Sequence, residues 1–129
     1  MPGQNFDLLV VDDQAGLRRL IYEALIDEGY IIDQAANGLE ALARLSKNKY
    51  RLILLDMKMP GISGLETFKE IRKLDSDVPV VMMTAYSELD MLPEMGAGIK
   101  PIQHLSKPFD LDDLRSLVRD CLSTNYAIR

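Results

Sequence analysis

The sequence has very few of the residues that build disulfides and zinc sites: one cysteine and one histidine among 129 residues. The single cysteine, Cys121, excludes a disulfide within the chain and a zinc site built from cysteines, and it suits a reducing, cytoplasmic location. The single histidine, His104, excludes a zinc site built from histidines. Its position in a predicted strand favours a partly buried packing residue over a catalyst.

Long apolar runs and an excess of positive charge are also missing. No apolar run approaches the roughly 18 residues that a membrane span requires, and residues 1–5 lack the basic and apolar regions of a signal peptide. The net charge of −5 argues against broad binding of nucleic acid, for which a basic face is expected. We therefore expect neither a membrane nor a nucleic acid among the partners.

The composition that remains is that of one globular domain. Apolar residues make up 47% of the chain and charged residues 27%, and a domain of this size buries about two-thirds of its unfolded surface. The sequence contains no internal repeat and no low-complexity linker. We expect residues 1–6 to form an N-terminal extension, residues 7–123 the folded domain and residues 124–129 a frayed tail.

The chain is organised around the stretch RLILLDMKMPG at residues 51–61. Four aliphatic residues, 52–55, lead into Asp56 and a loop that contains proline and glycine. An apolar run bounded by turn residues predicts a strand buried on both faces, as in a parallel sheet, although the run alone also fits a buried helix. Because an unpaired buried charge is costly, Asp56 is expected at the rim of the sheet.

The rest of the chain predicts an alternation of strands and helices. Further strands are expected at 7–11, 30–35, 79–83 and 102–105. Helices are expected at about 15–28, after a cap at Asn37, across 65–74, at 87–98 and after a cap at Asp110. Leu20 and Leu39 fall at the spacing of core-facing residues, whereas prolines and glycines predict a short or broken helix at 87–98. This alternation implies a doubly wound α/β fold with a parallel sheet.

Folds of this class bind ligands beyond the carboxyl ends of their strands. The residues that leave the first, third, fourth and fifth predicted strands are Asp12 and Asp13, Asp56, Thr84 and Lys107. The predicted fold would bring these side chains, which are distant in sequence, to one rim of the sheet.

The residue types at this rim suit a metal and a phosphoryl group. Three carboxylates repel one another, and a hard divalent cation relieves the repulsion, so Mg²⁺ is expected, with Mn²⁺ as the alternative. Asp56 is then the best placed nucleophile for a reaction through an aspartyl phosphate, while Lys107 and Thr84 hold phosphoryl oxygens. Each feature alone has a commoner structural explanation as a solvated acidic pair, a turn threonine or a loop lysine. Their combination favours the functional interpretation.

These residues, with the loop at 57–61, resemble the receiver domain of two-component response regulators. The resemblance runs from about Asp7 to Leu122, nearly the whole chain. It implies a flavodoxin-like (βα)5 sheet of five parallel strands in the order 2-1-3-4-5. Within the family, several segments most resemble free-standing receivers of sporulation phosphorelays. These segments are 11–14, 35–38, 55–60, 83–86, 88–91, His104 and 107–110.

The resemblance assigns roles to the residues at the rim. It implies that Asp56 is the phosphorylated residue, and that Mg²⁺ is held by Asp12, Asp13, Asp56 and the backbone carbonyl of Lys58. It also implies that Thr84 and Lys107 contact the phosphoryl group.

Further roles follow from the same resemblance. Lys107–Pro108 would be a cis peptide, which only a bond before proline adopts at modest cost. Lys58 and Tyr86 would flank the phosphate and tune its hydrolysis. Phosphorylation would bias a loop equilibrium around Tyr86 and His104. Most receivers have tyrosine or phenylalanine where His104 stands.

The resemblance also implies partners. A sensor histidine kinase and a histidine phosphotransferase are expected, with a phosphatase as a further partner, and any phosphohistidine donor must be another protein. Partner helices would dock on the first helix and the adjoining loops. That surface comprises Gln14, Ala15, Gly16, Leu17, Leu20, Tyr86, Pro108 and Phe109.

The function that the sequence favours is that of a single-domain relay receiver, which passes a phosphoryl group from a kinase to a histidine phosphotransferase during sporulation initiation. The alternative is a chemotaxis-type regulator that binds a target protein when phosphorylated. A phosphatase of the haloacid dehalogenase type is disfavoured, because it needs a second aspartate two residues after the nucleophile, where Lys58 stands here. An interaction module with a vestigial acidic rim would show no response to Mg²⁺.

Overall fold

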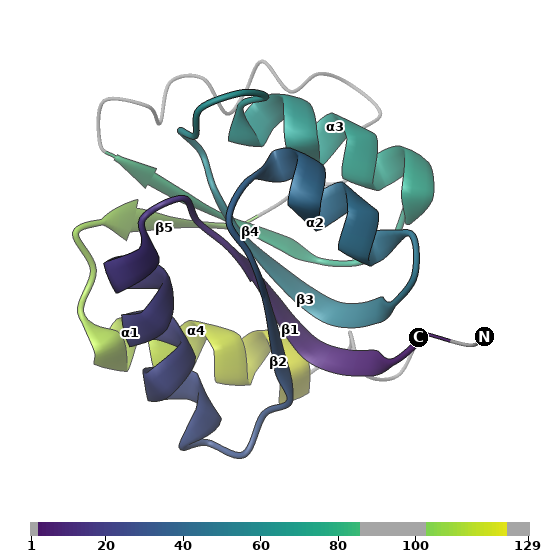
Figure 1. Cartoon of the computed structure of the whole chain (residues 1–129). Helices are drawn as coiled ribbons and strands as arrows, with labels where there is room; N and C mark the ends of the chain where they lie inside the picture. Colours follow the sequence, from purple (N-terminus) through teal and green to yellow (C-terminus); the bar gives the residue numbers. More distant parts are fainter. Residues whose placement is uncertain (1–2, 86–102, 124–129) are drawn as a thin grey trace.

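The computed structural model describes residues 3–85 and 103–123, and these residues form one parallel sheet covered by helices (Figure 1). Its five strands lie in the order β2-β1-β3-β4-β5, which confirms the predicted doubly wound, flavodoxin-like fold. The strands are β1 (Asn5–Val11), β2 (Ile32–Ala35), β3 (Lys49–Asp56), β4 (Val80–Ala85) and β5 (Gln103–Lys107). The described helices are α1 (Ala15–Ile26), α2 (Gly38–Leu45), α3 (Gly64–Leu74) and α4 (Leu111–Ser123).

Helices cover both faces of the sheet. Helices α1 and α4 lie on one face, and α2 and α3 lie on the other (Figure 1). Two apolar clusters fill the spaces between the layers, one containing Ile21 and Val118 and the other containing Ala41 and Phe68. None of the helices in the described ranges combines the length and apolarity needed to cross a bilayer.

The central strand β3 is buried on both faces, as its aliphatic run predicts. Leu52 and Leu54 pack in the cluster beneath α1 and α4, while Ile53 and Leu55 pack in the cluster beneath α2 and α3. All four side chains are fully buried, and each contributes roughly 1.5–3 kcal/mol of hydrophobic stabilisation. The strand therefore anchors Asp56, its last residue, to the most rigid part of the sheet.

Two leucines expected in the core lie at the surface instead. Leu39 is 67% exposed because α2 turns its small residues Gly38 and Ala41 toward the core, which leaves the intervening side chain outside. Leu20 is 46% exposed, and it lines a surface groove described below. The predicted cap of α2 is confirmed, since the Asn37 side chain accepts a hydrogen bond of 2.8 Å from the Glu40 backbone N–H.

Several element boundaries also differ from the predicted ones. Helix α1 ends at Ile26, and the chain then turns through Gly29, whose φ of 93° suits glycine. Strand β3 begins at Lys49, two residues before the stretch at 51–61, because Tyr50 is buried and stacks on Phe6 with ring centroids 5.3 Å apart. The helix expected at 87–98 lies outside the described residues.

Strand β5 continues to Lys107, two residues beyond the predicted end. Lys107 pairs with Ala85 of β4, so the lysine is held by the sheet rather than by a loop. His104 lies opposite Met82 in the same strand pair. Its side chain is exposed, so the expectation of a partly buried packing residue is wrong. Strand β5 is an edge of the sheet, which leaves side chains at this position less covered.

The loop after β3 is fixed by the start of α3. Ser63 and Glu66 form a reciprocal capping box, with both hydrogen bonds at 3.1 Å. Gly64 donates its backbone N–H to the Met57 carbonyl at 2.9 Å. A Cβ atom on Gly64 would overlap the Asp56 carbonyl and lie 2.7 Å from the Met57 Cα. The loop can therefore close behind Asp56 only because residue 64 has no side chain.

This close approach predicts that Gly64→Ala destabilises the protein. The new methyl group must push the Asp56 backbone aside, and overpacking of this kind costs about 1–3 kcal/mol. Gly16→Ala in α1 is the control, because a Cβ there meets no described atom within 4 Å. Within a helix, alanine stabilises the protein by roughly 0.5–1 kcal/mol relative to glycine. Urea unfolding measures both changes. Equal stabilities for the two variants would contradict the proposed packing.

Candidate functional site

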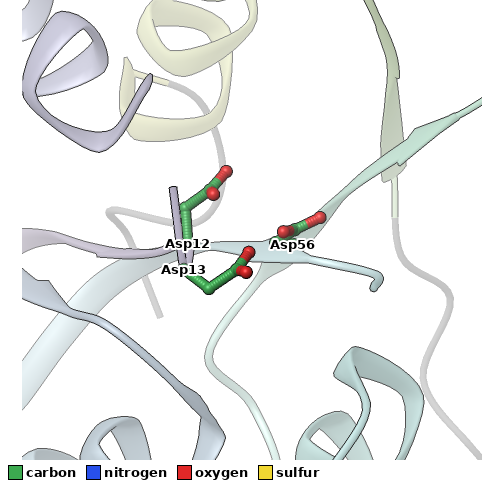
Figure 2. A group of neighbouring side chains, drawn as sticks. All are labelled: Asp12, Asp13 and Asp56. Carbon is green, nitrogen blue, oxygen red and sulfur yellow. The ribbon is translucent and has the colours of Figure 1, made fainter. Parts of the chain in front are cut away.

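Three aspartates meet at the carboxyl ends of β1 and β3. Asp12 and Asp13 follow β1, Asp56 ends β3, and the three carboxylates extend from neighbouring strands into one region (Figure 2). One oxygen from each lies within 4.8 Å of the other two. Asp12 is fully buried and Asp56 is 4% exposed, whereas Asp13 is exposed. The structure thus brings the predicted acidic residues together.

The strand register places these acids side by side. Val11 pairs with Leu55, so the residues that follow each strand leave the sheet at the same level. Asp12 is held further by its backbone N–H, which donates to the Ala35 carbonyl at 3.2 Å. Its Oδ1 accepts a bond of 2.9 Å from the Gln14 backbone N–H. The Asp12 carboxylate is therefore oriented before any ligand binds.

Lys107 supplies a cation to the buried acids. Its Nζ lies 3.1 Å from Asp56 Oδ1 and 3.4 Å from Asp12 Oδ2. Burial favours the neutral amine, but the Asp12 and Asp56 carboxylates outweigh this effect and raise the pKa of Lys107. The lysine therefore stays charged and bridges two of the acids.

Asp56 itself is poorly stabilised as an anion. Burial and the nearby Asp12 carboxylate raise its pKa from 3.8 to about 6, against the opposing effect of Lys107. The Lys58 backbone N–H lies 3.3 Å from Asp56 Oδ1 and gives limited further support. A carboxylate whose charge is incompletely compensated is suited to binding a cation or to forming an acyl phosphate.

Thr84 lies at the end of β4, between the strands that carry Asp56 and Lys107. It is fully buried, and its Oγ1 has no hydrogen-bond partner within residues 3–85 and 103–123. A buried hydroxyl without a partner is unusual, because desolvating it costs roughly 1–3 kcal/mol. The hydroxyl is thus available to a ligand oxygen at this rim.

The loop after Asp56 is tied down on both sides. The Met57 backbone N–H donates to the Met83 carbonyl of β4 at 2.9 Å, and the Met57 and Met59 side chains are buried. Lys58, between them, is exposed. The loop therefore holds Lys58 at the surface beside Asp56.

One contact at the site involves a residue that the sequence analysis did not single out. Arg18 of α1 donates from Nη1 to the backbone carbonyl of Asp12 at 2.6 Å. In the sequence, Arg18 stands out only as an arginine one turn into the helix that follows the acidic pair. Arginines are also common at surface positions of helices. The sequence therefore does not show that Arg18, and not its neighbour Arg19, contacts the site.

A groove of about 550 Å³ lies next to the acidic site. Leu17 and Leu20 of α1 form one wall, and the segment 107–111 forms the other. The Lys107–Pro108 peptide in that segment is cis, as the family resemblance implies. Gln14, Ala15 and Gly16 are exposed on the adjoining start of α1. Tyr86 lies outside the described residues, so the structure does not place it.

The donor set fits a hard divalent cation. Carboxylate oxygens are the ligands that Mg²⁺ takes in proteins, and the exposed Asp13 leaves a side of the cluster open to water. The Lys107 ammonium adds a cationic donor at Asp56, and the Thr84 hydroxyl, on the strand between them, has no hydrogen-bond partner among the described residues. The arrangement can therefore hold a metal ion and a phosphoryl group next to one carboxylate.

Comparisons with known proteins agree with this geometry. Sporulation initiation phosphotransferase F of Bacillus subtilis is 45% identical, over 92% of this chain and 94% of that protein. The chain also matches transcriptional regulators, of which it spans only about half the length.

Solved structures show the same fold. Response regulator protein TrrA from Thermotoga maritima, in complex with Mg²⁺-BeF, aligns with a TM-score of 0.76 and 39% identity, over 93% of this chain and 99% of that one. Chemotaxis protein CheY4 of Vibrio cholerae aligns with a TM-score of 0.80 and 28% identity, over 95% and 100% of the two chains. The family model of the response regulator receiver domain matches residues 8–119, and the chain belongs to this family.

Proposed function

We propose that this receiver domain, formed by residues 7–123, is a relay intermediate in the cytoplasm. It takes a phosphoryl group from the phosphohistidine of a sensor kinase onto Asp56 and passes it to a histidine phosphotransferase, in a phosphorelay that controls sporulation initiation. The observation that carries the proposal is the buried Asp56, with Lys107 Nζ at 3.1 Å and the Asp12 and Asp13 carboxylates beside it. The 45% identity to sporulation initiation phosphotransferase F along most of both chains supports the relay role.

In the proposed reaction an Asp56 carboxylate oxygen attacks the phosphorus of the phosphohistidine. The bond between phosphorus and the imidazole nitrogen breaks, and its electron pair leaves with the imidazole. The product is an acyl phosphate on Asp56 and a free histidine on the donor. Transfer to the second protein repeats the step in reverse, with the acceptor's imidazole nitrogen attacking the phosphorus and Asp56 leaving as a carboxylate.

The residues around Asp56 stabilise the charge that this transfer moves. Bound Mg²⁺, held by Asp12, Asp13, Asp56 and the Lys58 carbonyl, would neutralise charge on the phosphoryl oxygens. Lys107 already contacts Asp56 Oδ1 and needs only a small shift to reach a phosphoryl oxygen.

The Thr84 hydroxyl, which has no partner, would donate to another phosphoryl oxygen. Satisfying this hydroxyl would draw Thr84 toward the phosphate, and we infer that the movement biases a loop equilibrium around Tyr86 and the exposed His104. Lys58 and Tyr86 would then set how readily water hydrolyses the acyl phosphate.

The groove beside the site is the proposed docking surface for the relay partners and for a phosphatase. It is mainly apolar, it is lined by Leu17, Leu20, Pro108 and Phe109, and it continues into Lys107 at the phosphorylation site. A partner helix seated there would carry its phosphohistidine toward Asp56. Gln14, Ala15, Gly16 and Tyr86 would complete the contact.

The central prediction is that Asp56→Asn abolishes phosphorylation and leaves the fold intact. The amide cannot form the acyl phosphate, while its shape matches the carboxylate. Phosphotransfer from a panel of sensor kinases, followed by incubation with histidine phosphotransferases, measures both steps. Normal labelling of Asp56→Asn would place the acceptor elsewhere.

The same experiment separates the relay from a binding switch of the chemotaxis type, an alternative supported by the structural match to CheY4. A relay receiver loses its label to a histidine phosphotransferase within the incubation. A receiver that keeps its label with every phosphotransferase favours the binding switch.

A second prediction concerns pH in the absence of Mg²⁺. The pKa of Asp56 rises from 3.8 in the unfolded chain to about 6 in the folded one, so the protein loses stability as pH increases between these values. From pH 4.5 to 7.5, the stability of Asp56→Asn relative to wild type should therefore grow by about 2 kcal/mol. Urea unfolding in chelator measures it, and a difference that does not change with pH would contradict the raised pKa.

A third prediction tests the docking groove. Leu20→Ala should slow phosphoryl transfer from a kinase at least about tenfold, because a buried anchor at an interface contributes more than roughly 1–2 kcal/mol. Labelling by the small donor acetyl phosphate should not change. Leu39→Ala is the control, since Leu39 is also an exposed leucine on a helix but does not line the groove. Equal rates of phosphoryl transfer from the kinase to the two variants would show that the groove is not part of the docking surface.

A further inference from the structure

Arg18 connects helix α1 to the acidic site through the protein backbone. Its Nη1 donates to the carbonyl of Asp12 at 2.6 Å. This carbonyl belongs to the peptide that joins Asp12 to Asp13, the two acidic residues of the first strand end. A strong donor on that oxygen fixes the plane of the peptide, and with it the directions in which both side chains leave the backbone.

Polar contacts hold the junction between β1 and α1 at several groups of Asp12. Gln14, the N-cap of α1, makes no side-chain capping bond. The Asp12 backbone N–H bonds to the Ala35 carbonyl and the Asp12 Oδ1 accepts from the Gln14 N–H, so Arg18 supplies the remaining contact on the carbonyl side. Without it, the carbonyl of a fully buried residue would lose its charged donor.

Arg18 differs from Lys107 in how it offsets the acidic charge. Lys107 contacts the Asp12 and Asp56 carboxylates themselves, so it occupies oxygens that a metal would use. Arg18 brings its positive charge to the backbone oxygen and leaves the carboxylates free. An arginine placed in this way can remain in contact with the backbone while a cation binds the carboxylates.

The adjacent arginine shows that this placement is specific. Arg19 points away from the site and pairs with Glu23 at 3.0 Å, with a side chain that is 80% exposed. Both residues carry the same charge on the same turn of α1, but only Arg18 contacts the acidic strand end.

We propose that Arg18 is a positioning residue for the metal and phosphoryl site, acting through the Asp12–Asp13 peptide. The inference rests on the proposed function, because it assumes that these aspartates bind Mg²⁺. It adds that the geometry of the two ligands depends on a side chain that never touches the metal or the phosphoryl group.

The test compares Arg18→Met and Arg18→Lys with the control Arg19→Met. Titration with Mg²⁺, followed by amide chemical shifts in NMR, measures the dissociation constant on the folded protein. Loss of a contact that orients metal ligands should raise the dissociation constant of Arg18→Met about tenfold. Arg18→Lys should fall between it and wild type, because an ammonium on a shorter side chain restores the charge but only part of the contact. Arg19→Met should match wild type.

Labelling by acetyl phosphate provides the second measurement, and it involves no partner surface. At a Mg²⁺ concentration near the wild-type dissociation constant, Arg18→Met should label more slowly than wild type, and saturating Mg²⁺ should recover most of the rate. A purely structural role would lower the unfolding midpoint and leave the dissociation constant unchanged, which would overturn the proposal. Equal effects of Arg18→Met and Arg19→Met would also overturn the proposal, because Mg²⁺ binding would then depend on net charge and not on the Arg18 contact.

The outcome remains decisive if Arg18→Met does not fold. Arg18→Lys then carries the comparison, and a dissociation constant equal to that of wild type would refute the positioning role. Failure of the proposed function has a different signature, since wild type itself would then show no Mg²⁺ binding and no label on Asp56.

Discussion

Repulsion between buried carboxylates is the constraint on which the site depends. Asp12 and Asp56 are almost completely shielded from water. Burial of Asp56, with the Asp12 charge as the second cause, raises the pKa of Asp56 to about 6. The cation that offsets them comes from β5, whereas Asp56 ends β3, two strands away in the sheet. Strands are spaced about 4.8 Å apart, so only a long, flexible side chain can span β4, and Lys107 does so. The order of the strands and the choice of lysine are therefore linked.

The same constraint explains why the site is poised for a ligand. Lys107 contacts two of the acids, at 3.1 Å from Asp56 and 3.4 Å from Asp12, while Asp13 is exposed to solvent. A divalent cation would satisfy all three carboxylates at once and free the lysine. Thr84 adds a further unsatisfied group, because its buried hydroxyl on the neighbouring strand β4 has no hydrogen-bond partner among the described residues.

Much of this could be predicted from the sequence, because it depends on patterns that repeat along the chain. The aliphatic run before Asp56 predicted a strand buried on both faces, and acids, threonine and lysine at strand ends predicted a shared rim. The errors arose where the pattern carried no information. A helix with glycine and alanine on its inner face exposes Leu39, and an edge strand exposes His104. A bond from Arg18 to a backbone carbonyl leaves no trace in residue spacing.

Helix α1 carries residues of the proposed docking surface and a contact to the acidic site within one turn. Leu17 and Leu20 face the groove beside Pro108, while Arg18, between them in sequence, contacts the Asp12 carbonyl. The opposite wall of the groove begins at Lys107, which contacts the acids from the other side. Both walls of the proposed docking surface are therefore attached directly to charged groups of the site. Under the proposed docking, a partner in the groove would touch both elements that contact the acidic residues, so a direct route would connect docking to phosphoryl transfer.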